Sequence, residues 1–224
     1  MGRGDPTRTR AAAVDPPVPG TLIRVRPNLE PSIINSSISI VLPMLPTPML
    51  LRSSTAADVP ALRDIYAHAV THGTGTFEID VPGLDEMARR REAVLAAGLP
   101  WLVAERDGEL LGYAYANAFR PRPAYRFCVE DSIYLRPQAQ GAGVGTALLA
   151  ELVARCQAAG ARQMLAVIGD SDNLGSIGVH RALGFEACGL LRSVGWKFDR
   201  WLDVVLMQRS LGAGQGRPPA QRFA

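Results

Sequence analysis

Glycine recurs at alternate positions in one short stretch, at Gly141, Gly143 and Gly145, between a strand-like run that ends at Leu135 and a helical pattern that begins at Thr146. Because glycine has no Cβ, such a stretch can turn sharply and let a ligand approach the backbone closely. The helix that follows directs its free N–H groups and the positive end of its dipole toward the turn. The stretch therefore predicts a strand, a tight turn and a helix N-terminus that binds an anion such as a pyrophosphate. A turn that only connects the two elements is the alternative.

Two common nucleotide motifs do not fit this turn. No Lys-Ser or Lys-Thr follows the glycines, as a phosphate-binding P-loop requires. No acidic residue follows a further strand about 20 positions on, as a dinucleotide fold requires. The formal net charge of +3 is mild and the basic residues are dispersed, so we expect no nucleic-acid partner.

Cysteine and histidine patterns indicate which metals and which compartment to expect. The three cysteines lie far apart, without the paired spacing of a zinc site or a redox dithiol, and the three histidines form no metal-spaced cluster. We therefore expect no metal site. Isolated cysteines are typical of small buried residues in a reducing compartment, which predicts a cytoplasmic protein.

The chain of 224 residues has room for one ordinary domain and flanking segments. Nine of its 17 prolines precede Met49, so residues 1–48 are predicted to be a disordered extension, or a misassigned start with natural initiation at Met44 or Met49. The apolar stretch 38–51 is short and cut by prolines, so we expect no membrane span. Residues 49–211 should form the folded domain, and residues 212–224 a disordered tail.

Helical and strand patterns alternate within the folded region. The first predicted helix opens with a capping box at residues 55–58 and has its apolar positions between Leu62 and Val70. The other predicted helices cover residues 84–97, 146–158 and 176–183, and the predicted strands cover residues 50–52, 101–106, 109–118, 126–135, 164–168, 185–191 and 204–209. Asp107-Gly108 is a strong signal for a hairpin turn, and the run 164–168 reads as a strand buried on both faces. Trp101, Tyr113 and Trp201 are assigned mainly to the core. The order predicts an α/β (α+β) fold with a mixed central sheet flanked by helices.

Two carboxylates interrupt the apolar strand 126–135. Glu130 and Asp131 are adjacent, so their side chains should face opposite sides of the sheet. A carboxylate is costly to bury without a partner or a task. We therefore expect one of the two to be functional and the other to be paired or exposed, and the strand period leaves open which is which.

Three further segments could bind a substrate. Arg120-Pro121-Arg122-Pro123 holds two guanidinium groups on a stiff turn that suits a carboxylate ligand, although a solvated surface turn is the alternative. The segment 74–78 between the first two helices reads equally well as a substrate loop or as a surface connection. Lys197 either faces the anionic end of a substrate or belongs to an ordinary hairpin crossing.

Several motifs occur in the order found in one protein family. Gln140, Gly143 and Gly145 match the signature Gln/Arg-x-x-Gly-x-Gly/Ala, and so the chain resembles the GNAT superfamily of N-acetyltransferases. The segments 120–121, 129–134, 173, 176–185 and 195–203 are similar to those of its phosphinothricin and methionine sulfoximine acetyltransferase branch. The likeness covers residues 49–211. It implies the GNAT acyl-CoA N-acyltransferase fold, acetyl-CoA as co-substrate, a small amino acid or its analogue as acceptor, and a homodimer.

The resemblance also implies a set of site residues. The cofactor would contact Ile133, Tyr134 and Leu135 through their backbone, the turn formed by Gln140, Gly141, Ala142, Gly143, Val144, Gly145 and Thr146, and Asn173. The substrate would contact Arg120, Pro121, Arg122, Glu130, Asp131 and Ser132.

A mechanism follows from the chemistry of acetyl transfer to an amine. The attacking amine is an ammonium near neutral pH and must lose a proton, for which Glu130, with a pKa raised by burial, is the candidate base. Backbone N–H groups of the same strand would stabilise the oxyanion. His180 is a candidate acid for the thiolate leaving group, as in the branch that the chain resembles, or else a hydrogen-bonded histidine of the wall. Acetyl transfer to a protein N-terminus or a polyamine, and non-catalytic binding of acyl-CoA, are the rival functions.

Overall fold

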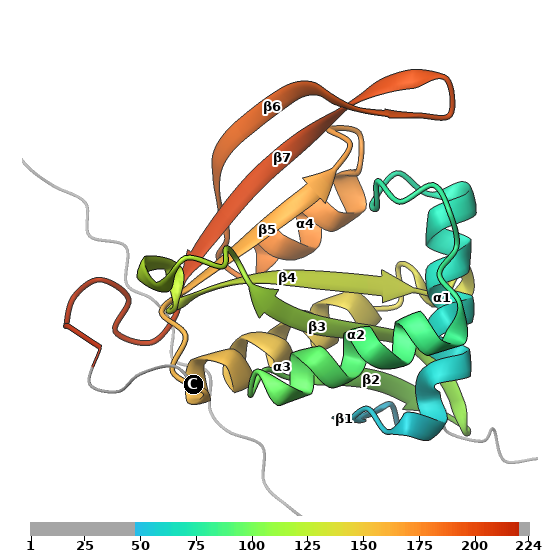
Figure 1. Ribbon diagram of the computed structural model, residues 1–224, viewed down its shortest axis with the longest axis horizontal. Coiled ribbons are helices and arrows are strands. Elements are labelled where there is room, and N and C mark those ends of the chain that lie inside the picture. The colour runs from blue at the N-terminus through green and yellow to red at the C-terminus, as the bar shows by residue number, and fades with distance from the viewer. Residues whose placement is uncertain (1–47, 220–224) are drawn as a thin grey trace, which may run out of the picture. The chain divides into compact units, whose positions relative to one another are not determined.

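The computed structural model describes residues 48–219, which form a seven-stranded mixed sheet in the order β1-β2-β3-β4-β5-β7-β6 (Figure 1). The expectations for residues 1–47 and 220–224 lie outside this part of the chain. The strands are β1 (Leu50–Ser53), β2 (Trp101–Arg106), β3 (Glu109–Ala118), β4 (Cys128–Leu135), β5 (Gln163–Gly169), β6 (Glu186–Lys197) and β7 (Arg200–Ser210). Neighbouring strands are antiparallel except β4 and β5, which are parallel. The predicted mixed sheet is confirmed.

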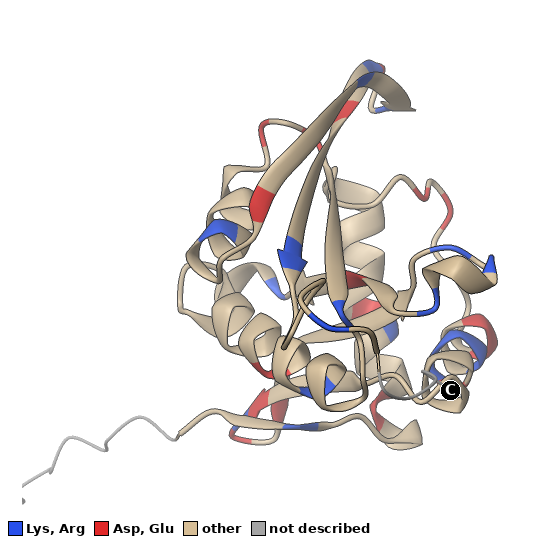
Figure 2. Cartoon of the chain, turned by 90° about the vertical axis from the view of Figure 1, so that its left-hand side faces the viewer, with Lys and Arg blue, Asp and Glu red and all other residues tan. Residues whose placement is uncertain are grey.

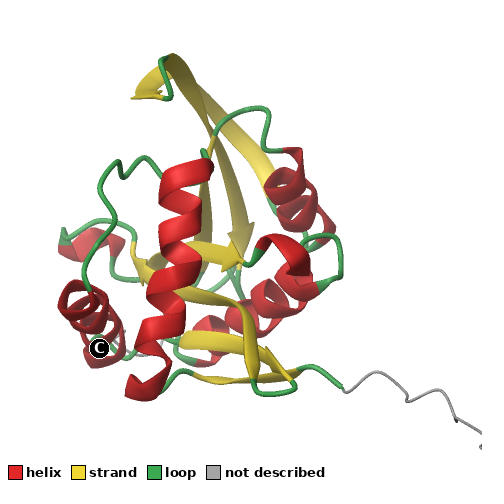
Figure 3. Ribbon diagram, turned by 90° about the vertical axis from the view of Figure 1, so that its right-hand side faces the viewer, coloured by secondary structure: helices red, strands yellow, loops and turns green. Residues whose placement is uncertain are grey.

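Helices cover both faces of the sheet (Figure 3). They are α1 (Val59–His72), α2 (Leu84–Ala96), α3 (Val144–Ala158) and α4 (Leu174–Ala182), with short 3-10 turns η1 (Ala56–Asp58), η2 (Pro123–Tyr125) and η3 (Pro137–Ala139). On one face, Tyr66 of α1 packs edge-on against Tyr134 of β4, with ring centroids 4.9 Å apart. On the other face, α3 approaches β4 so closely that a Cβ on Gly145 would lie 3.4 Å from Leu135 Cδ1. Within residues 48–219, no helix is long and apolar enough to cross a membrane.

The hairpin between β2 and β3 forms where the sequence predicts it. Asp107 and Gly108 have φ of 54° and 78°, so both central residues adopt the left-handed conformation that a two-residue hairpin turn requires. Asparagine, aspartate and glycine accept this conformation most readily, which explains why the Asp-Gly pair specifies the turn.

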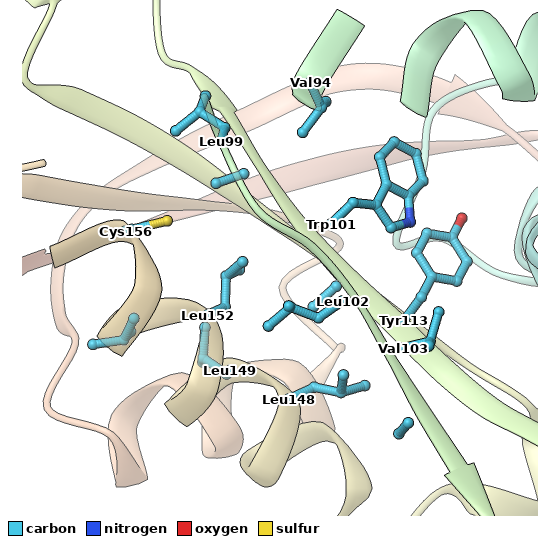
Figure 4. Packing of buried hydrophobic residues seen from close by; sticks show 14 of the residues in the cluster. Val94, Leu99, Trp101, Leu102, Val103, Tyr113, Leu148, Leu149, Leu152 and Cys156 are labelled. Atoms are coloured by element: carbon cyan, nitrogen blue, oxygen red, sulfur yellow. The ribbon is translucent and has the colours of Figure 1, made fainter. Parts of the chain in front are cut away.

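The core lies on both faces of the central strands. Figure 4 shows Leu102 of β2 beside Leu148, Leu149 and Leu152 of α3, on the face away from α1 and α2. Trp101 and Tyr113 are each 1% exposed, so their predicted place in the core is confirmed.

Strand β5 departs from the sequence-based expectation. Met164, Ala166 and Ile168 are buried, but Val167 is 38% exposed. The strand is therefore not buried on both faces. One of its faces packs into the core, and the other is partly open on the side that carries Gly169 and Val167.

The closing hairpin is longer than its apolar pattern suggests. β6 and β7 pair as far as Lys197 and Arg200 around a turn at Phe198 and Asp199, whose φ are 52° and 54°. Trp201 is 61% exposed, so its assignment to the core was wrong. Figure 1 shows this hairpin extending beyond the other strands, where the sheet has no further helix to bury an indole.

The chain after β7 does not leave the domain at once. Residues 212–216 form turns, in which Gly212 N–H donates to Gln157 Oε1 of α3 at 3.1 Å and Gly214 N–H to Leu211 O at 2.9 Å. These bonds hold the first turns after β7 near α3, and the predicted disorder of residues 212–224 stays a prediction.

Candidate active site

The parallel pairing of β4 with β5 is short. Only residues 128–131 of β4 pair with residues 163–166 of β5, and beyond them the two strands diverge (Figure 1). β3 continues to pair with β4 as far as Leu135. Residues 132–135 of β4 therefore have a strand on one side only, and we call their other side the open edge.

Antiparallel alternation decides which backbone groups face the open edge. Phe119 N–H donates to Cys128 O at 3.1 Å, so even-numbered residues of β4 exchange hydrogen bonds with β3. The backbone groups of Ile133 and Leu135 consequently point to the open edge, where an extended ligand can bind as an added strand would. The backbone of Tyr134 faces β3 instead. The geometry therefore supports the predicted backbone contacts of the cofactor with Ile133 and Leu135, but not with Tyr134.

The glycine turn follows β4 after the short 3-10 turn η3. Gly141 and Gly143 have φ of 72° and 79°, the left-handed region that residues with a Cβ rarely adopt. Gly143 is the N-cap of α3, and no side chain caps that helix. Gln140 and Ala142 are exposed on the turn. The helix start is thus free of internal side-chain partners, as an anion site requires.

Backbone N–H groups at the start of α3 supply the donors. Ala147 N–H is the first to bond back along the helix, to Gly143 O at 3.0 Å. The N–H groups of Val144, Gly145 and Thr146 precede this bond and have no partner within the helix. Together with the helix dipole they fit a pyrophosphate, and the cradle depends on the backbone rather than on a cationic side chain.

Asn173 lies at the N-terminus of α4, next to the end of β5. Its Oδ1 accepts from Ser176 N–H at 3.2 Å, and its Nδ2 donates to Gly169 O at 3.4 Å. The side chain therefore caps α4 and ties it to β5. The loop between α1 and α2 comes close here, since a Cβ on Gly75 would lie 3.7 Å from Asn173 Nδ2.

Glu130 and Asp131 occupy opposite faces of β4, as the strand period predicts, because β4 keeps a continuous register with both neighbours. Glu130 is half-buried on the face of α1 and α2, together with Ser132. Burial raises the pKa of the Glu130 carboxyl, the charge of Asp131 raises it further, and Arg120 opposes both. A base with a raised pKa retains more affinity for the proton that it removes.

Asp131 is buried on the face of α3 and α4, where it meets His180. Its Oδ2 lies 2.9 Å from His180 Nε2, and His180 Nδ1 lies 2.7 Å from Ser176 O. Burial works against the charged imidazole, but the hydrogen bond and charge of Asp131 outweigh it, so the pKa of His180 is raised. The expected contact of Asp131 with the substrate is corrected to a contact with His180, because its side chain points away from the Glu130 face.

The turn that carries Arg120, Pro121 and Arg122 is exposed. Arg120 Cζ lies 4.6 Å from the centre of the Phe119 ring, and its positive charge reaches Glu130. Figure 2 shows the other basic positions spread over several elements rather than gathered on one. Arg120 thus brings a positive charge to the neighbourhood of Glu130.

Aromatic residues form the wall of that face, and sequence reasoning did not assign them to the site. The Trp101 and Tyr115 rings stack with centroids 4.2 Å apart, and Tyr134 lies 5.3 Å from Tyr113. Tyr115 is opposite Ser132 in the ladder, so the stack begins beside the predicted substrate residues. The signal in the sequence was the alternation of Tyr113 and Tyr115 along β3, because residues two apart in a strand share one face of the sheet.

Lys197 does not face an open substrate site. Its ammonium donates to Gly73 O and to Thr76 O, both at 2.8 Å, and the residue is 6% exposed. The expectation that Lys197 binds the anionic end of a substrate is therefore corrected. The segment 74–78 is not a simple surface connection either, since Thr76 is buried.

Comparisons with known proteins agree on one family. Residues 62–185 match the model of the Acetyltransferase (GNAT) family. A phosphinothricin N-acetyltransferase of Alcaligenes faecalis is 56% identical over 162 residues, which are 72% of this chain and 82% of that protein. An L-methionine sulfoximine/L-methionine sulfone acetyltransferase of Pseudomonas paraeruginosa is 39% identical over 169 residues, which are 75% of this chain and 98% of that protein. A solved GNAT superfamily phosphinothricin acetyltransferase from Sinorhizobium meliloti, in complex with AcCoA, has a TM-score of 0.75 and 49% identity, covering 77% of this chain and 94% of that one.

Proposed function

Because the chain belongs to the GNAT family of acetyltransferases, we propose that it transfers the acetyl group of acetyl-CoA to the α-amino group of a small amino acid or analogue. Phosphinothricin, methionine sulfoximine and methionine sulfone are the acceptors that the names of its relatives suggest. The observation that carries the proposal is a half-buried Glu130 beside the open edge of β4. The same strand is followed, after η3, by the glycine turn and the N-terminus of α3.

Acetyl-CoA fits the two features that flank Glu130. The open edge offers the backbone of Ile133 and Leu135 to the amide groups of the pantetheine arm. The N–H groups at residues 144–146 offer donors to the pyrophosphate. Asn173 is bonded to the end of β5, the strand that diverges from β4, and it is the last of the proposed cofactor contacts. Acetyl-CoA supplies the electrophilic thioester carbonyl.

Glu130 is the proposed general base. It takes a proton from the substrate ammonium, and the freed nitrogen then forms the new C–N bond with the thioester carbon. Backbone N–H groups on the open edge would stabilise the oxyanion. The C–S bond breaks, and the electron pair leaves with the thiolate.

His180 is the proposed source of positive charge for the leaving thiolate. Its raised pKa favours the imidazolium, which Asp131 holds in place from the same face of the sheet. Both ring nitrogens already face acceptors, so His180 acts as an acid only if one of these contacts is exchanged for the thiolate. Its charge is available without such a change.

The electrostatics of the Glu130 face favour an amino acid over a polyamine. Arg120 and Arg122 lie on the exposed turn next to this face, and the charge of Arg120 opposes the rise in the pKa of Glu130. A guanidinium attracts the carboxylate of an amino acid and repels a polycation. We therefore assign the substrate carboxylate to this turn.

We also propose a cytoplasmic homodimer. Cys128, Cys156 and Cys188 are all free thiols, which suits a reducing compartment.

The β6–β7 hairpin bears apolar side chains that are at least 41% exposed, and a second copy of the chain would cover them. They are Leu190, Leu191, Val194, Trp196, Phe198 and Trp201. Light scattering should give twice the mass of the chain, and Trp201→Ser should shift the protein toward the monomer.

Acetyl-CoA consumption tests the proposed activity. Wild type, Glu130→Gln and the control Glu186→Gln, an exposed glutamate on β6, are compared with phosphinothricin, methionine sulfoximine, methionine sulfone and spermidine. Loss of a general base should lower kcat by about 10²–10⁴ for Glu130→Gln while acetyl-CoA still binds. The wild-type rate should fall on the acid side at a pH above the ordinary pKa of glutamate. Turnover of spermidine alone, or of no amine at all, would sink the proposal.

A further inference from the structure

The loop between α1 and α2 bridges the two strands that diverge at the site. We call residues 73–78 the bridging loop. On the side of β5, Thr74 O lies only 2.2 Å from where a Cβ on Gly169 would be. On the side of β4, the Thr76 hydroxyl lies 2.9 Å from Tyr66 OH, and the Tyr66 ring packs against Tyr134. The loop therefore lies over the Glu130 face and contacts both sides of the divergence.

One cation holds this loop at two points. Lys197 Nζ donates to the carbonyls of Gly73 and Thr76, at the start of the bridging loop and in its middle. The same hairpin receives the Phe77 ring, since a Cβ on Gly195 would lie 2.3 Å from Phe77 Cε2. An ammonium is costly to bury unless acceptors surround it, and burial lowers the pKa of Lys197. The buried position of Lys197 therefore costs its ammonium part of its hydration.

The choice of residue supports a specific role. Lys197 is the single lysine among the 24 lysine and arginine residues of the chain. A guanidinium is a planar fork that matches carboxylates, whereas an ammonium is compact and directs three N–H bonds tetrahedrally. The carbonyls of Gly73 and Thr76 converge on one buried point, which suits the compact ammonium and its N–H donors.

We propose that Lys197 is a positioning residue of the acceptor site. It fastens the bridging loop to the β6–β7 hairpin, and so fixes the place at which the loop holds the amino-acid substrate over Glu130. The inference rests on the proposed acetyltransferase activity and refines it. Lys197 acts on the substrate through the loop and not by touching it.

Kinetics of three variants test the proposal. Lys197→Met keeps the length of the side chain and removes its donors, Lys197→Arg keeps the charge with the wrong geometry, and Arg89→Met is a control on the exposed part of α2. Lys197→Met should raise the KM for the amino-acid substrate by about tenfold or more, because a small displacement in a site is costly. Its KM for acetyl-CoA should stay near the wild-type value. Lys197→Arg should fall between the wild type and Lys197→Met, and Arg89→Met should match the wild type.

Amide hydrogen exchange separates positioning from direct binding. Without substrate, Lys197→Met should speed exchange in residues 73–78 and leave α3 unchanged. If KM rises while exchange in the bridging loop stays at the wild-type rate, Lys197 contacts the substrate itself and the proposal is wrong. If neither changes, it is wrong as well. If wild type acetylates no amino acid, the proposed function fails, and the exchange result still decides whether Lys197 holds the loop.

A measurement on the wild type serves if Lys197→Met does not fold. An amine-reactive reagent should spare the single lysine of the native chain, which is 6% exposed. Unfolded protein should be labelled at Lys197, as the mass of the peptide that contains it would show. Labelling of Lys197 in the native protein at the rate of the unfolded chain would overturn the proposal, since a fastened ammonium is protected.

Discussion

Replacing Gly169 by alanine should displace the bridging loop and leave the acetyl-CoA side of the site in place. Gly169 ends β5, and a Cβ there would lie 2.2 Å from Thr74 O and 3.1 Å from Phe77 Cε1. Non-bonded heavy atoms pack best at about 3.5 Å or more, so the Thr74 carbonyl has to move by roughly 1 Å. A backbone carbonyl cannot rotate away as the end of a side chain can. The loop itself must move.

The size of the effect follows from this overlap. Overpacking of a well-packed site costs about 1–3 kcal/mol, and alanine regains about 0.4–1 kcal/mol by restricting the unfolded chain. The net loss of about 1–2 kcal/mol should lower the Tm by about 2–8 °C for a domain of this size. A shift of about 1 Å near the reacting groups can lower kcat/KM by about a hundredfold.

Thermal unfolding and steady-state kinetics measure both effects on Gly169→Ala. The matched control is Gly178→Ala, because Gly178 is exposed in α4 and a Cβ there meets nothing within 4 Å. The control should gain stability by about 1 kcal/mol, since glycine is unfavourable within a helix. The KM for acetyl-CoA should change little in Gly169→Ala.

An unchanged Tm together with a wild-type kcat/KM for the amino acid would refute this reasoning. It would mean that Thr74 is not held against β5 and that the bridging loop yields without cost. A rise in the KM for acetyl-CoA alone would also contradict it, because the overlap lies on the acceptor side of the strand.

The remaining predictions concern two ion pairs and the pH range in which each stabilises the fold. Asp131→Asn should cost about 2 kcal/mol in urea unfolding below pH 6.5. The cost should shrink at higher pH, because the pKa of His180 is raised in the folded state and its charge is lost as pH rises through that value; a cost that grows with pH would contradict the assignment. Arg52→Met should cost about 2 kcal/mol at neutral pH, since Arg52 donates to both oxygens of Asp58 at 2.8 Å. Hydrogen bonds from Arg52 lower the pKa of Asp58 from 3.8 to about 2, so acid unfolding of the wild type and the variant should converge as pH falls through this range.

Features that depend on neighbouring residues along the chain could be predicted from the sequence. The turn at Asp107-Gly108 follows from the tolerance of these residues for positive φ. The opposite faces of Glu130 and Asp131 follow from the period of two in a strand. The helix after the glycine turn likewise follows from the local pattern, although it begins at Val144 rather than at Thr146. These conclusions required no knowledge of what packs against each element.

Features that depend on partners far along the chain were missed or misassigned. Asp131 meets His180, which is 49 positions away, and the strand period cannot choose a partner across the sheet. Trp201 is exposed because the hairpin extends beyond the helices, although its indole is typical of a core residue.

By itself, the sequence determined the order of elements, the glycine turn and the two faces of β4, because backbone preference and side-chain alternation act over a few residues. Only the tertiary structure decided that β4 and β5 part after residue 131, leaving an edge for a ligand. It also decided that Lys197 holds Gly73 and Thr76, more than 120 positions away, rather than facing the substrate. The physical reason is that burial and hydrogen-bond partners are set by long-range packing, which changes the role of a charged side chain without changing its local pattern.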